Sequence, residues 1–363
     1  MIIQALSDQE RFDRLRLART ERIGPVAFDH LIRRFGDAGR AIDALPDLSR
    51  GGGATPAAAD AIRREIEAGN ALGARLIVLG EPDYPALLAA LDPPPPILWT
   101  LGDAALLSRE AVAVVGARVA SAAGQRFARG LADELGQAGY VVVSGMARGI
   151  DAAAHAGSLD TGTVAVLAGG IDDVYPSEHR PLYEQIRSGG CLVAESPPGT
   201  HAQARDFPRR NRVISGLSRA VVVVEAELRS GSLVTARLAG EQGREVLAVP
   251  GSPLDPRARG TNDLIRQGAA LCEGAEDVLR ALGRPHNLAL REPAEAFEEP
   301  AREPPRPLVD QVRALLSPMP APYDEIVRAT AAAAPDVFAA LVELAVAGEA
   351  DLLGGGLVCR KLR

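Results

Sequence analysis

The stretch Ala111-Val-Ala-Val-Val-Gly-Ala-Arg118 decides the fold, because five apolar residues run directly into a glycine turn that ends in an arginine. Such an unbroken run is typical of a β-strand that is buried on both faces. Six similar runs follow and alternate with helical patterns, at 140–143, 163–167, 191–194, 220–224, 245–249 and 269–272. The pattern predicts an α/β domain with a doubly wound parallel sheet, in an extended Rossmann-like fold.

The residues before this sheet predict a small helical domain at 1–72, and the sheet domain is expected at 73–283. Within the helical part, Arg22-Ile-Gly-Pro25 joins two short helical patterns. The turn resembles a helix-hairpin-helix or SAM-like domain, whose backbone N–H groups can bind a DNA phosphate. The alternative is a degenerate hairpin that only packs.

The C-terminal region divides into a linker and a third domain. Residues 284–307 contain six prolines and five glutamates, which is typical of a linker. Residues 308–363 contain three helical patterns followed by two strand patterns around Gly354-Gly-Gly356, as in a winged helix. The presumed recognition helix, 337–347, carries Glu343 and no arginine or lysine. This favours a protein-interaction or weak DNA-binding role over sequence-specific DNA reading.

The composition limits the possible functions. The formal net charge of −7 argues against a protein that coats nucleic acid by bulk charge, so any such site must be a focused groove. No stretch approaches 18 uninterrupted apolar residues, and a cytoplasmic protein without membrane contact is expected. Cys191, Cys272 and Cys359 are far apart and form no metal-binding pattern, so buried free thiols and no metal site are expected.

A basic cluster at 205–219 holds five arginines and one aspartate. Pro208 suits the first turn of a helix, whose first turn would then carry the arginines of Arg209-Arg-Asn-Arg212. Cations at a helix N-terminus oppose the helix dipole, which favours a bound anion. An aromatic ring beside arginines is the combination that binds single-stranded nucleic acid, so Phe207 is a candidate for base stacking. The alternative is a solvated arginine face with Phe207 in the core.

The loops that follow the predicted strands are rich in glycine, serine and arginine. Ligands of doubly wound sheets bind at the carboxyl ends of the strands, so these loops predict an anion site. They lie at 116–118, 144–151, 169–176, 195–198, 225–232 and 250–253. A G-x-G-x-x-G turn is absent after the first strand, which disfavours a dinucleotide, and no cofactor is expected.

Taken together, five motifs resemble the DprA/Smf family of DNA-processing proteins over nearly the whole chain. They are Ser144-Gly-Met-Ala-Arg-Gly-Ile-Asp151, Ala168-Gly-Gly-Ile-Asp172 with Tyr175-Pro176, Phe207 to Ser218, Ser230-Gly-Ser-Leu-Val-Thr-Ala236 and Val249-Pro-Gly251. The resemblance implies a homodimer that binds single-stranded DNA, protects incoming DNA and helps load the RecA recombinase in natural transformation and DNA recombination. It also implies a protein that is not an enzyme.

The resemblance assigns binding roles to particular residues of this sequence. Phe207 would meet a base. The remaining nucleic-acid contacts would come from Arg118, Ser144, Gly145, Arg210, Asn211, Arg212, Ser230, Gly231 and Ser232.

The competing class is a nucleotide-hydrolysing enzyme of the related phosphoribohydrolase group. Those enzymes resemble P-G-G-x-G-T-x-x-E, with a glutamate beside the glycosidic bond. Here the corresponding loop reads Arg229-Ser-Gly-Ser-Leu-Val-Thr235, with Glu225 and Glu227 before it and no glutamate directly after it. A non-enzymatic binder is therefore the favoured interpretation.

Self-association is expected near the carboxyl end of the sheet domain, around Leu264, Ile265 and Leu271. A short helix starting at Asn262 or Asp263 would point Leu264 and Ile265 about 100° apart. The sheet can cover one of these side chains more readily than both, and a two-fold interface would bury the other. The alternative is that both pack inside the monomer.

Overall fold

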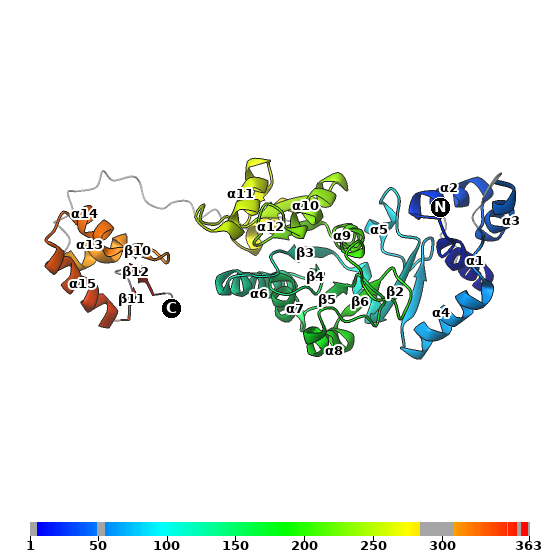
Figure 1. Cartoon of the computed structure of the whole chain (residues 1–363), viewed down its shortest axis with the longest axis horizontal. Coiled ribbons are helices and arrows are strands. Elements are labelled where there is room, and N and C mark those ends of the chain that lie inside the picture. The colour runs from blue at the N-terminus through cyan, green and yellow to red at the C-terminus, as the bar shows by residue number, and fades with distance from the viewer. Residues whose placement is uncertain (1–5, 49–54, 284–307, 347, 354–356, 362–363) are drawn as a thin grey trace. The chain divides into compact units, whose positions relative to one another are not determined.

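The computed structural model describes residues 6–48, 55–283, 308–346, 348–353 and 357–361 (Figure 1). The chain forms two compact units, Met1–Asn287 and Leu288–Arg363. The predicted linker at 284–307 and the glycine runs at 51–53 and 354–356 lie outside the described residues.

A nine-stranded sheet forms the centre of the first unit, in the order β1-β2-β6-β5-β4-β3-β7-β8-β9. The strands from β3 onward pair in parallel, whereas β2 pairs antiparallel with β6, and β1 with β2. The predicted doubly wound α/β sheet is confirmed. The bounds are β1 (Arg75–Val78), β2 (Ile97–Gly102), β3 (Ala111–Val115), β4 (Val141–Ser144), β5 (Thr163–Val166), β6 (Cys191–Ala194), β7 (Ala220–Val223), β8 (Glu245–Ala248) and β9 (Ala270–Leu271).

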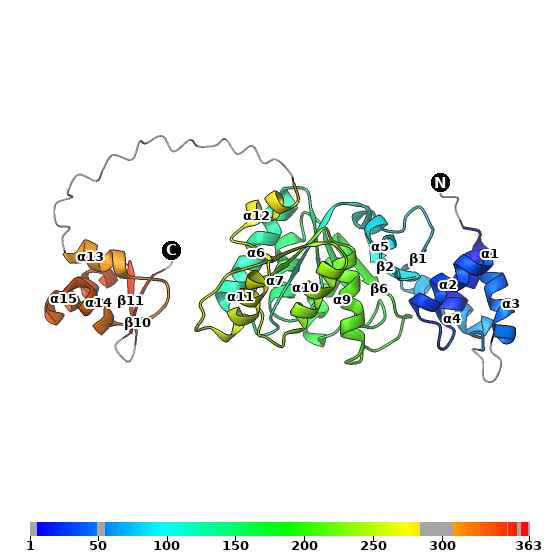
Figure 2. The ribbon, with the colours of Figure 1, turned by 90° about the horizontal axis from the view of Figure 1, so that it is seen from above.

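Helices cover both faces of this sheet, which is why its strands are apolar without alternation. Ala113 and Val115 pack on one face together with residues of α9 and α10, while Val112 and Val114 pack on the other with residues of α6 and α7. Both views show α9 and α10 side by side on one face (Figures 1 and 2). The helices are α5 (Ala86–Ala89), α6 (Ala122–Gln137), α7 (Ile150–Ser158), α8 (Arg180–Gly189), α9 (Asp206–Gly216), α10 (Gly231–Glu241), α11 (Arg259–Arg266) and α12 (Ala275–Ala281), with 3-10 turns η1 (Ala104–Ser108), η2 (Ser177–His179) and η3 (Pro256–Ala258).

The N-terminal helices pack directly on the antiparallel edge of the sheet. Leu15, Ile62, Val78 and Ile97 form one buried cluster, which joins α1 and α4 to β1 and β2. Arg19 strengthens this junction, because it pairs with Glu65 at 2.9 Å and donates a hydrogen bond to the Glu195 carbonyl at 3.0 Å. The helices are α1 (Asp8–Ala18), α2 (Pro25–Phe35), α3 (Ala38–Leu48) and α4 (Ala59–Ala71).

The second unit contains the predicted winged helix. Its elements are α13 (Leu308–Leu315), β10 (Ala321–Pro322), α14 (Tyr323–Thr330), α15 (Ala334–Val346), β11 (Ala350–Leu353) and β12 (Leu357–Arg360). The three strands pair antiparallel in the order β10-β12-β11. Val312, Ile326, Val337 and Leu341 are in the core that joins the helices to the strands.

The cysteines are free thiols. Cys191 and Cys272 are buried as expected, and burial raises the pKa of each thiol to about 12. The expectation is wrong for Cys359, which is only half-buried on β12, the central strand of the small domain. Within the described residues, no cluster of three or more His, Cys, Asp and Glu side chains is placed to bind a metal ion. No helix in these same residues combines the length and apolarity needed to cross a membrane.

Candidate nucleic-acid interface

The candidate site lies where the order of the strands reverses. From β3 the chain adds β4, β5 and β6 on one side, and then returns to place β7 on the other side of β3. The loops after β3 and β7 therefore diverge and leave a crevice at the carboxyl ends of the strands. This switch-point groove has a volume of about 450 Å³ and is lined by residues 115–119, Ala147, Asp151, Phe207, Pro208, Arg210, Asn211, Ile214, Glu227, 229–232, Val234 and Thr235.

The N-terminus of α10 forms one wall of the switch-point groove. Ser230 caps this helix, since its side chain accepts a hydrogen bond from the Ser232 N–H at 3.3 Å. The two hydroxyl groups are 2.7 Å apart. No atom lies within 4 Å of the position that a Cβ of Gly231 would take, so the backbone is open to the groove here. A helix N-terminus with free N–H groups and hydroxyls favours an anion.

Two arginines bring uncompensated positive charge to the same groove. Arg118 follows β3 and Arg229 follows β7, and both side chains are exposed. Neither makes a hydrogen bond or an ion pair with any residue that the structure describes. Glu227 is the exposed carboxylate in the lining. Cations left without a counter-charge in a concave surface attract a polyanion.

Phe207 lies between the charged groups of the groove. Its half-buried ring has the guanidinium carbon of Arg118 at 5.2 Å from its centroid and that of Arg210 at 5.9 Å. The Tyr175 ring is 5.5 Å away at an interplanar angle of 60°. The ring therefore supports two guanidinium groups by cation–π attraction, and it is neither a plain core residue nor a free stacking surface.

Arg210 and Gly145 support the groove from beneath and do not open into it as phosphate donors. Arg210 is only 7% exposed, and its Nη1 donates hydrogen bonds to the carbonyls of Gly145 at 2.6 Å and Val166 at 2.9 Å. Burial lowers the pKa of its guanidinium to about 10. A Cβ on Gly145 would lie 1.8 Å from this Nη1, so only glycine permits the contact. The Gly145 N–H is bound to Asp151 at 3.2 Å.

Ser144 and Arg212 lie away from the groove, which corrects two expectations. Ser144 is the last residue of β4 and is fully buried, and its hydroxyl donates to the Val114 carbonyl at 2.7 Å. Arg212 pairs with buried Glu195 at 2.5 Å on another side of α9. A helix turns by about 100° per residue, so Arg210 and Arg212 cannot face the same groove.

The start of α9 also differs from the sequence prediction. The helix begins at Asp206, two residues before Pro208. Its first turn therefore holds an acidic residue that suits the helix dipole, and the arginines come later. The carboxylate of Asp206 accepts a hydrogen bond from the Gln203 N–H at 2.8 Å.

Seven of the ten predicted contact residues line one groove, although the Arg210 guanidinium is already hydrogen-bonded to two carbonyls. Arg118, Phe207, Arg210, Asn211, Ser230, Gly231 and Ser232 all line the switch-point groove. Sequence reasoning missed Arg229 and Tyr175, although both follow strands at the same edge of the sheet. Ligands of such sheets bind at the carboxyl ends of the strands, and this rule could have selected both residues.

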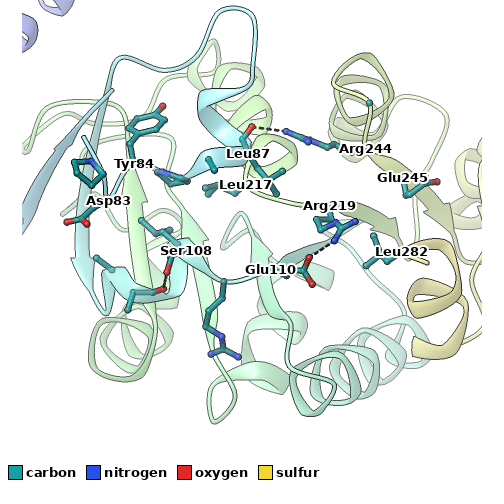
Figure 3. A pocket seen from close by; sticks show the side chains of 18 of the residues that line it. Asp83, Tyr84, Leu87, Ser108, Glu110, Leu217, Arg219, Arg244, Glu245 and Leu282 are labelled. Atoms are coloured by element: carbon teal, nitrogen blue, oxygen red, sulfur yellow. Dashed lines mark hydrogen bonds and ion pairs between the residues drawn. The ribbon is translucent and has the colours of Figure 1, made fainter. Parts of the chain in front are cut away.

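A larger pocket, of about 840 Å³, lies at the amino ends of the strands (Figure 3). Its arginines already have partners within the protein. Arg219 is paired with Glu110, and Arg244 donates to the Leu87 carbonyl at 2.8 Å. Arg75 is paired with Asp83, and Arg109 donates to two carbonyls. Every arginine of this pocket is thus ion-paired or hydrogen-bonded within the protein, unlike Arg118 and Arg229 of the switch-point groove.

Comparison with known proteins shows the family of this chain. Residues 75–283 match the family model of DNA recombination-mediator protein A, which covers more than half of the chain. The chain belongs to this DprA/Smf family. Residues 8–68 match the DprA-like N-terminal helix-hairpin-helix domain, and residues 296–356 match the DprA winged-helix domain. All ten predicted nucleic-acid contacts fall within the first of these matches.

Relatives in the family match this chain over more than half of its length. Protein Smf of Synechocystis is 36% identical over 302 residues, which cover 74% of this chain and 75% of that protein. DNA processing protein DprA of Bacillus subtilis is 42% identical over 224 residues, which cover 61% of this chain and 75% of that protein. The crystal structure of DprA from Streptococcus pneumoniae superposes with a TM-score of 0.63 at 28% identity, covering 76% of this chain and 98% of that one. A structure of DprA from Helicobacter pylori concerns its single-stranded DNA binding mode. It has a TM-score of 0.54 at 27% identity and covers 58% of this chain and 96% of that one.

Proposed function

We propose that the chain binds single-stranded DNA in the switch-point groove. The observation that carries this proposal is that Arg118 and Arg229, both without an acidic partner among the described residues, face the same groove as the N-terminus of α10. Phosphates of a strand can accept hydrogen bonds from the helix start and pair with both guanidinium groups. The DprA relative from Helicobacter pylori, whose structure concerns its single-stranded DNA binding mode, has a similar fold.

Within this proposal the protein protects incoming DNA and helps to load the RecA recombinase in natural transformation. The family description, recombination-mediator protein, supports this role. A direct test is the assembly of RecA filaments on a strand already covered by a single-strand binding protein. The wild-type chain is expected to accelerate assembly, and Arg118→Ala is expected to lose most of that acceleration. Equal rates with and without the wild-type chain would refute the mediator role.

A non-enzymatic role fits the positions of the two carboxylates that an enzyme would need. Both oxygens of Glu225 accept hydrogen bonds from Ser121, so this carboxylate caps α6. Glu227 is exposed in the lining of the groove. Neither carboxylate is paired with a second acid or base in the way that general acid–base catalysis requires. These positions support binding without turnover.

The proposal includes a homodimer formed through α11 and β9. Leu264 packs against the core, whereas Ile265 belongs to none of the described core clusters. Leu271 is 43% exposed on β9, the edge strand of the sheet. Apolar side chains beside an open strand edge favour pairing with a second copy. Two grooves on one dimer would raise the effective concentration of a bound strand.

Helix α15, where a DNA reader needs cations, contains no arginine or lysine, and α14 contains one, the exposed Arg328. Phe338 on α15 is 53% exposed and contacts Tyr323 edge-on, with ring centroids 6.3 Å apart. Asp324, Glu325 and Asp336 are exposed on the same two helices. This composition supports a protein-interaction role for the domain.

The experiment that tests the central proposal compares oligo(dT) with a duplex of equal length by fluorescence anisotropy at several salt concentrations. We expect tighter binding of the single strand, and a logarithm of affinity that falls linearly with the logarithm of salt. The slope should be about −0.7 for each neutralised phosphate. Equal affinity for the duplex, or no binding of the single strand, would overturn the proposal.

A further inference from the structure

A second recess adjoins the switch-point groove and has no assigned role. It is lined by Arg118, Gly145, Ala147, Arg148, Tyr175, Pro176, Phe207 and Arg210. Four of these residues, Arg118, Ala147, Phe207 and Arg210, also line the switch-point groove. The two hollows therefore share a wall, and a ligand bound in one can extend into the other.

Tyr175 is the exposed aromatic side chain of this recess. It follows β5 in the loop that leads to η2, and it is 55% exposed. Its ring is tilted by 60° against Phe207, so it makes one aromatic contact and leaves much of its surface to solvent. An aromatic ring that remains exposed at the margin of a basic groove is well placed to stack on a base.

Phe207 is less available for this role than its sequence context predicts. Arg118 and Arg210 both approach its ring, and Tyr175 contacts it as well. Phe207 thus holds the other groups in place. Tyr175 offers the aromatic surface that Phe207 lacks.

The charges around the recess favour a base over a phosphate. Arg148 is bound to both carboxylate oxygens of Glu178, at 2.5 and 2.7 Å. Its positive charge is therefore largely neutralised, in contrast to that of Arg118 on the shared wall. Phosphates are attracted to Arg118 on the shared wall, while the side of the recess away from that wall presents the Tyr175 ring and Pro176 beside the paired Arg148.

We propose that the exposed ring of Tyr175, beside this small recess of about 40 Å³, forms a nucleobase subsite, on which one unstacked base of a strand stacks while the phosphates of that strand lie in the switch-point groove. This inference rests on the proposed single-strand binding. It adds an affinity for bases that electrostatic binding of the sugar-phosphate backbone does not supply. Because every base has a π-face, the subsite accepts any sequence.

The test measures the affinity of Tyr175→Ala and Tyr175→Phe for oligo(dT) and for an abasic oligonucleotide of the same length. Tyr175→Ala should bind oligo(dT) roughly 5- to 150-fold more weakly, the fold-change that corresponds to the loss of one stacked base. Its affinity for the abasic strand and its salt slope should match those of the wild type. Tyr175→Phe keeps the ring and should retain wild-type binding of both strands.

A second measurement does not depend on the variants. The wild-type protein is photocrosslinked to a single strand that carries 5-iodouracil, and the modified residue is mapped by mass spectrometry. A crosslink at Tyr175 supports the subsite. Crosslinks confined to other residues would overturn it. So would an equal loss of affinity for oligo(dT) and for the abasic strand in folded Tyr175→Ala. Failure of the wild type to bind either strand would instead refute the proposed function itself.

Discussion

The carboxylate of Glu225 accepts two hydrogen bonds from Ser121, one from the backbone N–H at 2.9 Å and one from the hydroxyl at 2.5 Å. Ser121 is the N-cap of α6, the helix that follows β3. In dinucleotide-binding sheets, the first helix N-terminus receives the pyrophosphate. Here a carboxylate of the protein occupies the equivalent position, which gives a physical reason for the absence of a glycine-rich dinucleotide turn.

The first prediction concerns the close packing of Glu225 on α6. A Cβ at Gly124 would lie 2.5 Å from the Glu225 Oε1, whereas no atom lies within 4 Å of a Cβ at Gly130 on the same helix. We expect Gly124→Ala to displace the carboxylate and lower the free energy of unfolding by about 1–2 kcal/mol, the range for a lost helix cap. Gly130→Ala should raise it by about 0.5–1 kcal/mol, because alanine favours helix. Urea denaturation of both variants measures the difference, and equal shifts would contradict the packing argument.

The second prediction separates two arginines that the sequence treated alike. Arg118→Ala should weaken binding of single strands and reduce the salt slope by about 0.7, because one phosphate contact is lost. Arg212→Ala should leave the slope unchanged and destabilise the fold, because Glu195 is 8% exposed and would keep only the more distant Arg209 guanidinium at 3.7 Å. The loss should stay below about 3 kcal/mol, the cost of breaking a buried pair completely. Anisotropy titrations and thermal melting distinguish the two effects. An altered slope for folded Arg212→Ala would contradict the assignment.

The third prediction uses the ion pair between Arg148 and Glu178. Both side chains are more than half exposed, so their separation should hardly change stability. Glu178→Gln removes the negative charge and leaves Arg148 beside the nucleobase recess. We expect tighter strand binding and a salt slope that is steeper by up to about 0.7. The double variant Glu178→Gln with Arg148→Ala is the control and should show no gain. Equal gains in both variants would show that Arg148 is not responsible.

The fourth prediction is a dependence of stability on pH that arises from His155. This side chain is fully buried, and burial lowers its pKa from 6.5 to about 3. Between these two values the unfolded chain binds a proton that the folded chain excludes. His155 therefore lowers stability progressively as the pH falls from about 6.5 towards 3, by at most about 1.4 kcal/mol per pH unit.

His155→Leu removes the titrating group and tests this dependence. The difference in unfolding free energy between the wild type and this variant should change with pH between 6.5 and 4 and be constant above pH 8. Thr163 keeps a partner in the variant, since its hydroxyl also donates to the Val142 carbonyl at 3.1 Å. A difference that does not vary with pH would show that His155 titrates alike in the folded and the unfolded chain.

The fifth prediction tests the dimer with two neighbouring positions on α11. Ile265→Glu should give a folded monomer, because this side chain is outside the described core clusters. Leu264→Glu should unfold the sheet domain, because Leu264 packs against buried residues and a buried unpaired charge is costly. Light scattering and circular dichroism of the full chain measure both properties. A folded dimer for Ile265→Glu would exclude this surface.

Much of the fold and part of the groove follow from the sequence alone. Apolar runs such as 111–115 predict strands buried on both faces, and a parallel sheet places all their following loops at one edge. This reasoning was sufficient to select Arg118 and the Ser230-Gly-Ser232 loop, which both line the groove. Local helical and strand patterns also predict the winged helix.

Tertiary structure decided which polar side chains face the groove and which are hydrogen-bonded or ion-paired within the protein. Arg210 and Arg212 are two residues apart, yet one supports the loop at Gly145 and the other neutralises Glu195, because the helix phase sends them in different directions. Ser144 does not reach the groove because the strand end is buried, whereas Tyr175 is a candidate contact because it is exposed. A sequence determines residue type and local periodicity, but exposure and charge neutralisation depend on contacts between residues far apart along the chain.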